Sequence, residues 1–282
     1  MPSVPRYSVD DVEDKDWVVF VQSSWKPAVV GRFVLRFPWH GDGDVLEAVE
    51  ATYGGDDGGG EGGGAVSGNV EDYVQLQLEG GIAFGTGEHP TTQLCLEWIC
   101  DTLPSLTTTI ATTDDDDDDD DAEQEAPLFL DYGSGSGVLG LAACAISPDN
   151  AAHNNLRSIG IDIDPDAVRI ASYNARVNGL AMKSYLPPST IDDDDGDDYE
   201  SASVLMKAVY RTDTERLPEG LDGCLYDACA ANILAGPLRM LVGRIAGMVR
   251  VGGKIGLRLV CCCCVPNSAT GQRRTRRWVG VT

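Results

Sequence analysis

The chain has 282 residues, of which 43% are hydrophobic, and its formal net charge at pH 7 is −24. Residues 114–121 and 192–198 supply fourteen of the 45 acidic side chains, so the remainder of the chain is only moderately acidic, at about −10. An acidic surface disfavours binding to nucleic acid, whose phosphates attract Lys and Arg, and it suits a basic protein as partner. The length allows one large domain, or a domain with an extension.

Cysteine spacing and hydropathy exclude several other classes of protein. The nine cysteines include the run 261–264 but show no paired Cys-x-x-Cys spacing, so we expect no metal site. No apolar run approaches the ~20 residues of a membrane span, and the N-terminus shows no signal or transit peptide. We therefore expect a cytoplasmic protein that binds no membrane, while an organellar location stays open if the N-terminus is incomplete.

The first part of the chain, residues 1–73, is predicted to be an N-terminal β extension. Its sequence is strand-like over residues 17–22 and 31–39, with Pro27 between them. A glycine-rich stretch, residues 54–68, cannot bury a core and is expected to form a flexible loop.

A larger domain is predicted over residues 74–260, interrupted by acidic insertions at 107–126 and 187–201. It opens with an alternating strand at 74–79. A helix is expected at 93–103, capped by Thr91 or Thr92, with one apolar face made of Cys95, Leu96, Ile99 and Leu103. We expect the insertions to be disordered because their aspartates repel one another.

Residues 128–140 are typical of a short buried strand that turns at glycines and opens a helix. Gly133, Gly135 and Gly137 allow the backbone to turn tightly and to approach a ligand, and the helix N-terminus favours an anionic or polar group. A dinucleotide fingerprint ends in a third glycine at the position that Val138 occupies here. The order Asp-x-Gly-x-Gly-x-Gly instead favours S-adenosyl-L-methionine, although a simple tight turn is an alternative.

The strands and helices that follow predict a doubly wound, mostly parallel α/β sheet. A strand at 158–163 ends near Asp162, a position from which an acidic residue can hold ribose hydroxyls. The next helix is expected to start at Asp164 and Pro165 and to stop at Gly179. Further strands are expected at 204–210, 225–231 and 254–260. A regular helix precedes the last of them, stopped by the glycines at 252–253, and its core positions are Leu238, Leu241, Val242, Ile245, Met248 and Val249.

Four ordered segments resemble the PrmA type of protein methyltransferase, which modifies a large-subunit ribosomal protein, and its electron-transfer-flavoprotein lysine methyltransferase relatives. The segments are Ala83-Phe-Gly-Thr-Gly-Glu-His-Pro-Thr-Thr92, Leu130-Asp-Tyr-Gly-Ser-Gly-Ser-Gly-Val-Leu139, Gly160-Ile-Asp-Ile-Asp-Pro-Asp-Ala167 with Asn174 and Asn178, and Ala231-Asn-Ile-Leu-Ala-Gly-Pro-Leu238. The resemblance implies a class I methyltransferase fold with S-adenosyl-L-methionine as donor.

The resemblance also implies that Thr92, Gly133, Asp162 and Asn232 contact the donor, and Gly135 is expected to bind it in the same turn. A helix N-cap is the alternative role for Asn232. His89 could orient the amine or take its proton, but we favour a hydrogen-bonded turn residue. No catalytic base is assigned.

The last 22 residues, 261–282, form an atypical basic tail where the resemblance implies one more helix and two strands. We therefore expect the C-terminal closing strands to be lacking. The predicted function is methylation of a lysine or an N-terminal amine of a protein, with a ribosomal protein or an electron-transfer flavoprotein as candidate substrates. The alternatives are an NAD-linked oxidoreductase and a catalytically inactive protein that binds the cofactor.

Overall fold

The computed structural model describes residues 24–53, 70–79, 85–110, 126–146, 156–187 and 225–260. Their central feature is a parallel sheet with the strand order β6-β5-β4-β7-β8. The strands are β4 (Leu128–Tyr132), β5 (Arg157–Ile161), β6 (Met182–Tyr185), β7 (Tyr226–Leu234) and β8 (Val249–Val260). This strand order confirms the predicted doubly wound α/β class.

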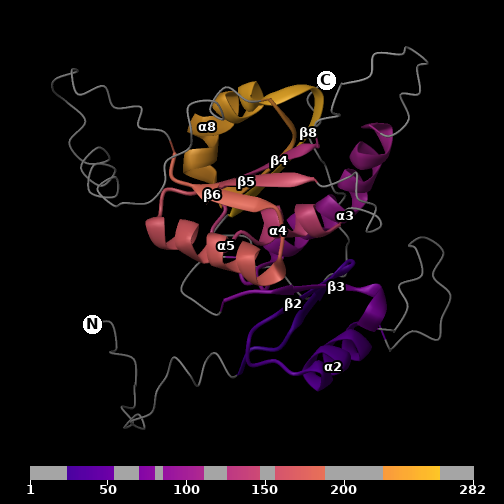
Figure 1. Ribbon diagram of the computed structural model, residues 1–282. Coiled ribbons are helices and arrows are strands. Elements are labelled where there is room, and N and C mark those ends of the chain that lie inside the picture. Colours follow the sequence, from indigo (N-terminus) through magenta and orange to yellow (C-terminus); the bar gives the residue numbers. More distant parts are fainter. Residues whose placement is uncertain are drawn as a thin grey trace, which may run out of the picture.

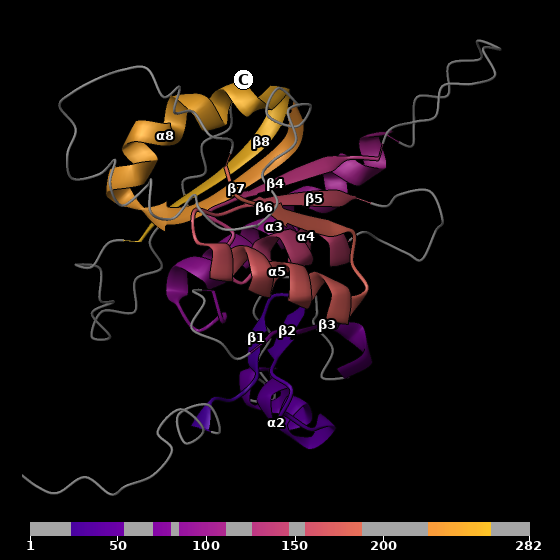
Figure 2. The same ribbon diagram turned by 60° about the vertical axis from the view of Figure 1, so that its left-hand side comes forward.

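Helices cover both faces of this sheet, as a parallel sheet requires. They are α3 (Pro90–Ile110), α4 (Val138–Ala145), α5 (Pro165–Asn178) and α8 (Ala235–Met248). Helix α8 lies on one face, while α3, α4 and α5 lie on the other (Figures 1 and 2). Within the described residues, no helix is both long and apolar enough to span a membrane.

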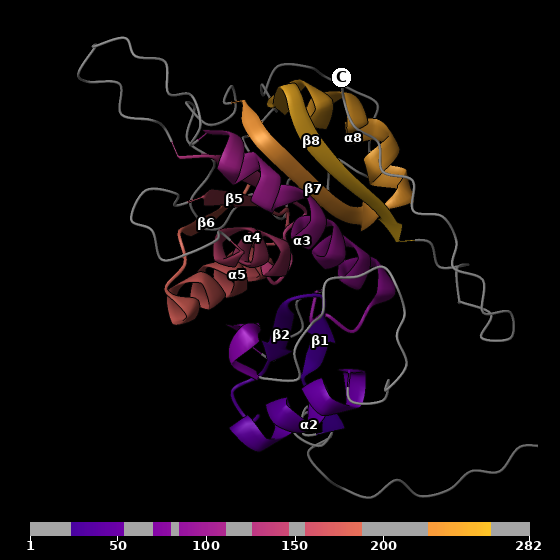
Figure 3. The ribbon, with the colours of Figure 1, turned by 90° about the vertical axis from the view of Figure 1, so that its right-hand side faces the viewer.

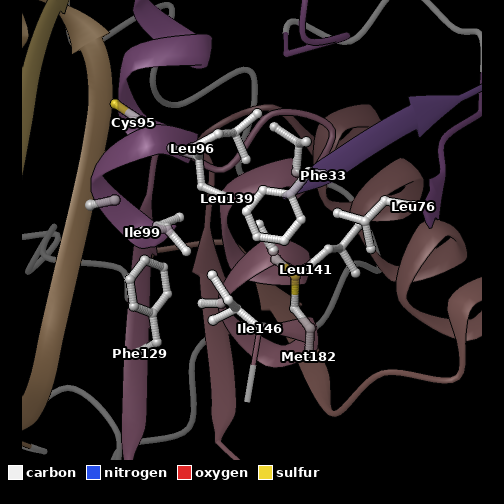
Figure 4. Close-up of a cluster of buried hydrophobic side chains, with 14 of the residues drawn as sticks. Phe33, Leu76, Cys95, Leu96, Ile99, Phe129, Leu139, Leu141, Ile146 and Met182 are labelled. Atoms are coloured by element: carbon white, nitrogen blue, oxygen red, sulfur yellow. The ribbon is translucent and has the colours of Figure 1, made fainter. Parts of the chain in front are cut away.

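Side chains that alternate along β4 connect the sheet to two hydrophobic clusters. Phe129 points to the side of α3 and α4, where it packs in the cluster shown in Figure 4. Leu128 and Leu130 point to the opposite side and pack with residues of α8, among them Ile245. Since β4 is buried on both faces, its continuous apolar run is a consequence of its central position.

A smaller three-stranded sheet lies beyond α4 and α5 (Figure 3). It contains β1 (Ala28–Val30), β2 (Phe33–Arg36) and β3 (Val74–Gln77), with β1 antiparallel and β3 parallel to β2. It is accompanied by α2 (Asp42–Tyr53) and the short 3-10 helix η1 (Val70–Asp72). Phe33 and Leu76 extend from this sheet into the cluster that contains Phe129 (Figure 4).

The N-terminal region differs from the prediction in two respects. Strand β1 begins directly after Pro27, and the sequence pattern did not indicate it; β2 lies inside the predicted 31–39 segment. Helix α2 was also missed, because it buries only Val45 and Val49 within its span. The predicted strand at 17–22 and the glycine-rich loop at 54–68 lie outside the described residues.

Other boundaries are corrected by the structure. Helix α3 begins at Pro90 and continues to Ile110, so it is longer than the predicted 93–103 and includes residues 107–110 of the predicted insertion. Asp164 caps α5, Pro165 begins it, and Gly179 ends it in the left-handed conformation, as predicted. Most of the two predicted insertions lies outside the described part of the chain, which includes only residues 107–110, 126 and 187 of them. The predicted strand at 204–210 and the basic tail at 261–282 lie outside it as well, because the structure does not describe residues 111–125, 188–224 and 261–282.

The last helix and strand were predicted with two errors. Val242 is 44% exposed and not part of the core, because α8 packs on the sheet through the buried Leu238, Ile245 and Met248, with the partly buried Leu241 and Ala246 against the same cluster. The glycines at 252–253 do not stop the helix, which ends at Met248; they lie inside β8, where its register against β7 shifts between Tyr226 and Ala228. Gly253 fits there because a Cβ would lie 2.8 Å from the carbonyl oxygen of Asp227.

Candidate functional site

The turn between β4 and α4 has a backbone conformation that favours glycine. The φ angles of Gly133 and Gly137 are 76° and 80°. A Cβ at Gly133 would overlap the side chain of Ile233, and one at Gly137 would lie 2.9 Å from Cβ of Ala171. The turn itself therefore requires both glycines. That Gly133 and Gly135 also admit a ligand stays a prediction.

The strand register brings three of the predicted site residues to one edge of the sheet. Tyr132 in β4 pairs with Ile161 in β5 and with Ala231 in β7. The next residues along these three neighbouring strands are Gly133, Asp162 and Asn232. Since paired strands lie ~4.8 Å apart, these three residues line up across the carboxyl ends of the strands, where parallel α/β sheets bind ligands.

Asp162 fastens the glycine turn to the end of β5. Its Oδ2 accepts a 2.7 Å hydrogen bond from the backbone N–H of Gly135, and its Oδ1 accepts one of 3.0 Å from Asp164. Burial raises the pKa of the Asp162 carboxyl, while these N–H groups act in the opposite direction. Asp162 and Gly135, predicted separately, are therefore in direct contact, and each carboxylate oxygen has lone-pair capacity for a further donor.

Thr92 and Asn232, which are 140 residues apart in sequence, also meet. Nδ2 of Asn232 donates to Oγ1 of Thr92 over 3.1 Å, and Thr92 is fully buried. Oδ1 of Asn232 is buried and has no hydrogen-bond partner among the described residues. The N-cap alternative for Asn232 is wrong, since α8 begins after Leu234 and no side chain caps it. A buried polar atom without a partner is a position where a ligand could bind, and the donor contact of Asn232 stays a prediction.

The start of α3 is capped by His89 and not by a threonine. The helix begins at Pro90, which places Thr91 and Thr92 inside its first turn. The ring Nδ1 of His89 accepts a 3.2 Å hydrogen bond from the backbone N–H of Thr91 and lies 2.6 Å from the Thr91 hydroxyl. These contacts agree with the interpretation of His89 as a hydrogen-bonded turn residue.

Asp131, the first residue of the Asp-x-Gly-x-Gly-x-Gly order, is the most perturbed carboxyl of the site. It is 1% exposed, and burial raises its pKa to about 8 although the N–H of Gly140 donates to its Oδ2 over 2.9 Å. Its Oδ1, like the hydroxyl of Ser134, is buried without a hydrogen-bond partner among the described residues. The sequence signal that could have revealed this buried carboxyl is an aspartate near the carboxyl end of an otherwise apolar strand.

A hollow of about 430 Å³ lies away from this edge, against α2. It is lined by Ser24, Trp25, Lys26, Pro27, Trp39, His40, Asp44, Glu47, Ala48 and Ala51. None of these is a predicted site residue. In the part of the chain that the structure describes, no three His, Cys, Asp or Glu side chains gather in a way that could hold a metal ion.

Replacing Asp131 with Asn is expected to remove one pH dependence of stability. Burial raises the folded-state pKa from 3.8 to about 8, so the protonated carboxyl contributes to the free energy of unfolding. This contribution is fully present below about pH 4 and is lost as the pH rises through 8. The amide can still accept from Gly140 and loses no proton. A tenfold change in proton affinity corresponds to about 1.4 kcal/mol. Between pH 5 and pH 8, the free energy of unfolding of the variant, measured in urea, should therefore rise by at least that much relative to that of the natural chain. Parallel pH profiles would contradict a protonated Asp131.

Comparison with known proteins identifies the family of the chain. The family model described as ribosomal protein L11 methyltransferase (PrmA) matches residues 66–258. The ribosomal protein L11 methyltransferase of Chromobacterium violaceum is 31% identical over 256 residues, which cover 90% of this chain and 58% of that protein. The protein of the same description from Cupriavidus pinatubonensis is 29% identical over 253 residues, covering 89% and 57%.

Among solved structures, the ribosomal protein L11 methylase of Lactobacillus delbrueckii subsp. bulgaricus matches with a TM-score of 0.38 and 18% identity, over 80% of this chain and 77% of that one. The chain spans less than two thirds of the length of the two curated relatives from Chromobacterium violaceum and Cupriavidus pinatubonensis. On the family match over residues 66–258, the chain belongs to the PrmA family, described as ribosomal protein L11 methyltransferase.

Proposed function

We propose that this chain is an S-adenosyl-L-methionine-dependent protein N-methyltransferase that acts on a lysine or an N-terminal amine. The observation that carries the proposal is the alignment of Gly133, Asp162 and Asn232 at the carboxyl edge of the sheet, given by the pairing of Tyr132 with Ile161 and Ala231. Membership of the PrmA family supports it and favours it over an NAD-linked oxidoreductase.

The residues at this edge fit the proposed donor. Three of the buried polar atoms without hydrogen-bond partners among the described residues belong to Asp131, Ser134 and Asn232, which lie within the last residues of β4 and β7 or just beyond β4. Others lie elsewhere, for example on Arg36 in β2 and on Tyr73 beside β3. Asp162 would accept from the ribose hydroxyls, and the backbone at Gly133 and Gly135 would border the donor. Thr92 would hold the Asn232 amide, since it accepts the hydrogen bond from Nδ2.

The donor supplies a methyl group on a sulfonium, which makes the methyl carbon electrophilic. The chain's own residues would have to orient a neutral amine of the substrate protein toward that methyl group, because only a neutral nitrogen has a lone pair free to form the new bond. A free lysine has a pKa near 10.4, and desolvation in a closed site lowers that pKa. Oδ1 of Asn232, which lacks a partner among the described residues, can accept a hydrogen bond from an amine N–H. Positioning of this kind supplies much of the rate.

A basic protein is the substrate class that best fits the charge of the chain. The formal net charge is −24, which attracts Lys- and Arg-rich surfaces and repels phosphate backbones. Relatives of this chain are described as ribosomal protein L11 methyltransferases, so that ribosomal protein is the first candidate substrate. An electron-transfer flavoprotein is the second candidate, and direct binding to nucleic acid or membranes is not part of the proposal.

Replacing Asp162 with Asn should weaken binding of S-adenosylhomocysteine at least tenfold in isothermal titration. The Asn side chain carries no negative charge to attract the ribose hydroxyls. It also has only one oxygen, whereas both Asp162 oxygens accept hydrogen bonds from backbone N–H groups. Asp164→Asn is the matched control, because Asp164 caps α5 through the N–H of Asp166. The control should bind within about twofold of the natural chain. Equal losses in both variants, or binding of NAD in preference, would contradict the assigned donor site.

Methyl transfer is tested by incubating the chain and radiolabelled S-adenosyl-L-methionine with a whole-cell lysate, and separately with purified ribosomal protein L11. We expect label on one basic protein and, by mass spectrometry, on a lysine or N-terminal amine. Asn232→Ala should reduce the label at least tenfold. Tight binding of S-adenosylhomocysteine without labelling of any protein would identify the chain as an inactive cofactor-binding protein.

A further inference from the structure

Helix α5 lies beside β3 (Figure 2). It carries two asparagines one turn apart, Asn174 and Asn178, that form hydrogen bonds with β3 and with the residues directly after it. Asn178 holds a single residue of that strand: its Oδ1 accepts from the N–H of Gln77 over 2.8 Å, and its Nδ2 donates to the carbonyl of Gln77 over 2.7 Å. Asn174 instead bridges two segments. Its Oδ1 accepts from the N–H of Glu79 over 2.7 Å, and its Nδ2 donates to the carbonyl of Ser136 over 2.9 Å.

Ser136 belongs to the glycine turn and is held from two directions. Its carbonyl accepts from Asn174, and its hydroxyl donates to the carbonyl of Gly85 over 2.9 Å. Gly85 lies on the glycine segment that leads to α3 and Thr92. Ser136 is 2% exposed, so water cannot readily replace these contacts. The turn is therefore tied through one residue to the segments on both sides of residues 80–84.

The contact at Asn174 requires a side-chain amide. The N–H of Glu79 needs an acceptor and the carbonyl of Ser136 needs a donor, and these two needs fix the orientation of the amide. Asn174 is 1% exposed. A carboxylate of the same shape would keep the first hydrogen bond but would place an oxygen against the carbonyl of Ser136, and losing a buried partner in this way is costly.

We propose that Asn174 is a positioning residue that couples the segment after β3 to the glycine turn, so that binding of the methyl donor at the turn and the order of the Glu79 amide depend on each other. The proposal rests on the proposed function, since it takes the turn as the donor site. Asn178 has the same residue type and lies on the same helix, where its Nδ2 also donates to the backbone carbonyl of Asn174 over 2.8 Å. It has no hydrogen bond to the turn among the described residues, so it is assigned to anchoring β3 on α5.

The test compares Asn174→Asp with Asn178→Asp in the full chain. We expect Asn174→Asp to weaken binding of S-adenosylhomocysteine at least tenfold, and Asn178→Asp to change it less than twofold. Urea unfolding of both variants measures how much stability each substitution costs, so that affinity is compared between chains that are folded. If Asn174→Asp does not fold, Asn174→Ala and Asn178→Ala, which introduce no carboxylate, are compared in the same way.

Hydrogen exchange distinguishes the proposed coupling from a purely structural role of Asn174. Saturating S-adenosylhomocysteine should slow exchange of the Glu79 amide in the natural chain and in Asn178→Asp, and should leave it unchanged in Asn174→Asp. Equal affinity losses in the two variants, or unchanged affinity in Asn174→Asp, would overturn the coupling while the natural chain still binds. Failure of the natural chain to bind S-adenosylhomocysteine would overturn the proposed function, and the coupling with it.

Discussion

The parallel pairing of β4 with β5 and β7 is the constraint on which the site depends. A shift of either neighbour by one residue would separate Asp162 or Asn232 from Gly133 and would turn the buried side chains of that strand to the wrong face. The register is protected because β4 is buried on both faces, with Phe129 on one side and Leu130 on the other. Core packing and site geometry are therefore fixed by the same strand pairs.

The cost of this arrangement is a set of polar groups that the described part of the chain leaves without partners. The raised pKa of Asp131 and the buried oxygens of Ser134 and Asn232 are unfavourable for stability by themselves. Polar groups of this kind are rare in folded proteins and gather at functional sites. Three of these groups, on Asp131, Ser134 and Asn232, lie at the edge where β4 and β7 end, beside the Asp162 carboxylate, and this favours that edge over the hollow near Trp25 and Trp39 as the place where a ligand binds.

Local sequence signals predicted much of this fold. The glycine spacing at 133–137 and the Asp164–Pro165 start of α5 could be recognised because each depends on a few adjacent residues. Sequence patterns could not reveal contacts between distant segments, such as those of Asn174 with Glu79 and of Asn232 with Thr92. Helix α2 was missed, and the glycines at 252–253 were assigned to a helix end and not to β8, for a related reason: tertiary packing rather than local periodicity decides both.

The most direct test of the central claim is a crystal structure of the chain with S-adenosylhomocysteine. The account predicts density for the ligand at the carboxyl ends of β5, β4 and β7, within hydrogen-bonding distance of Asp162 and beside Gly133 and Asn232. Ligand density in the hollow between Trp25 and Trp39, or an unchanged glycine turn with no ligand at saturating concentration, would contradict it.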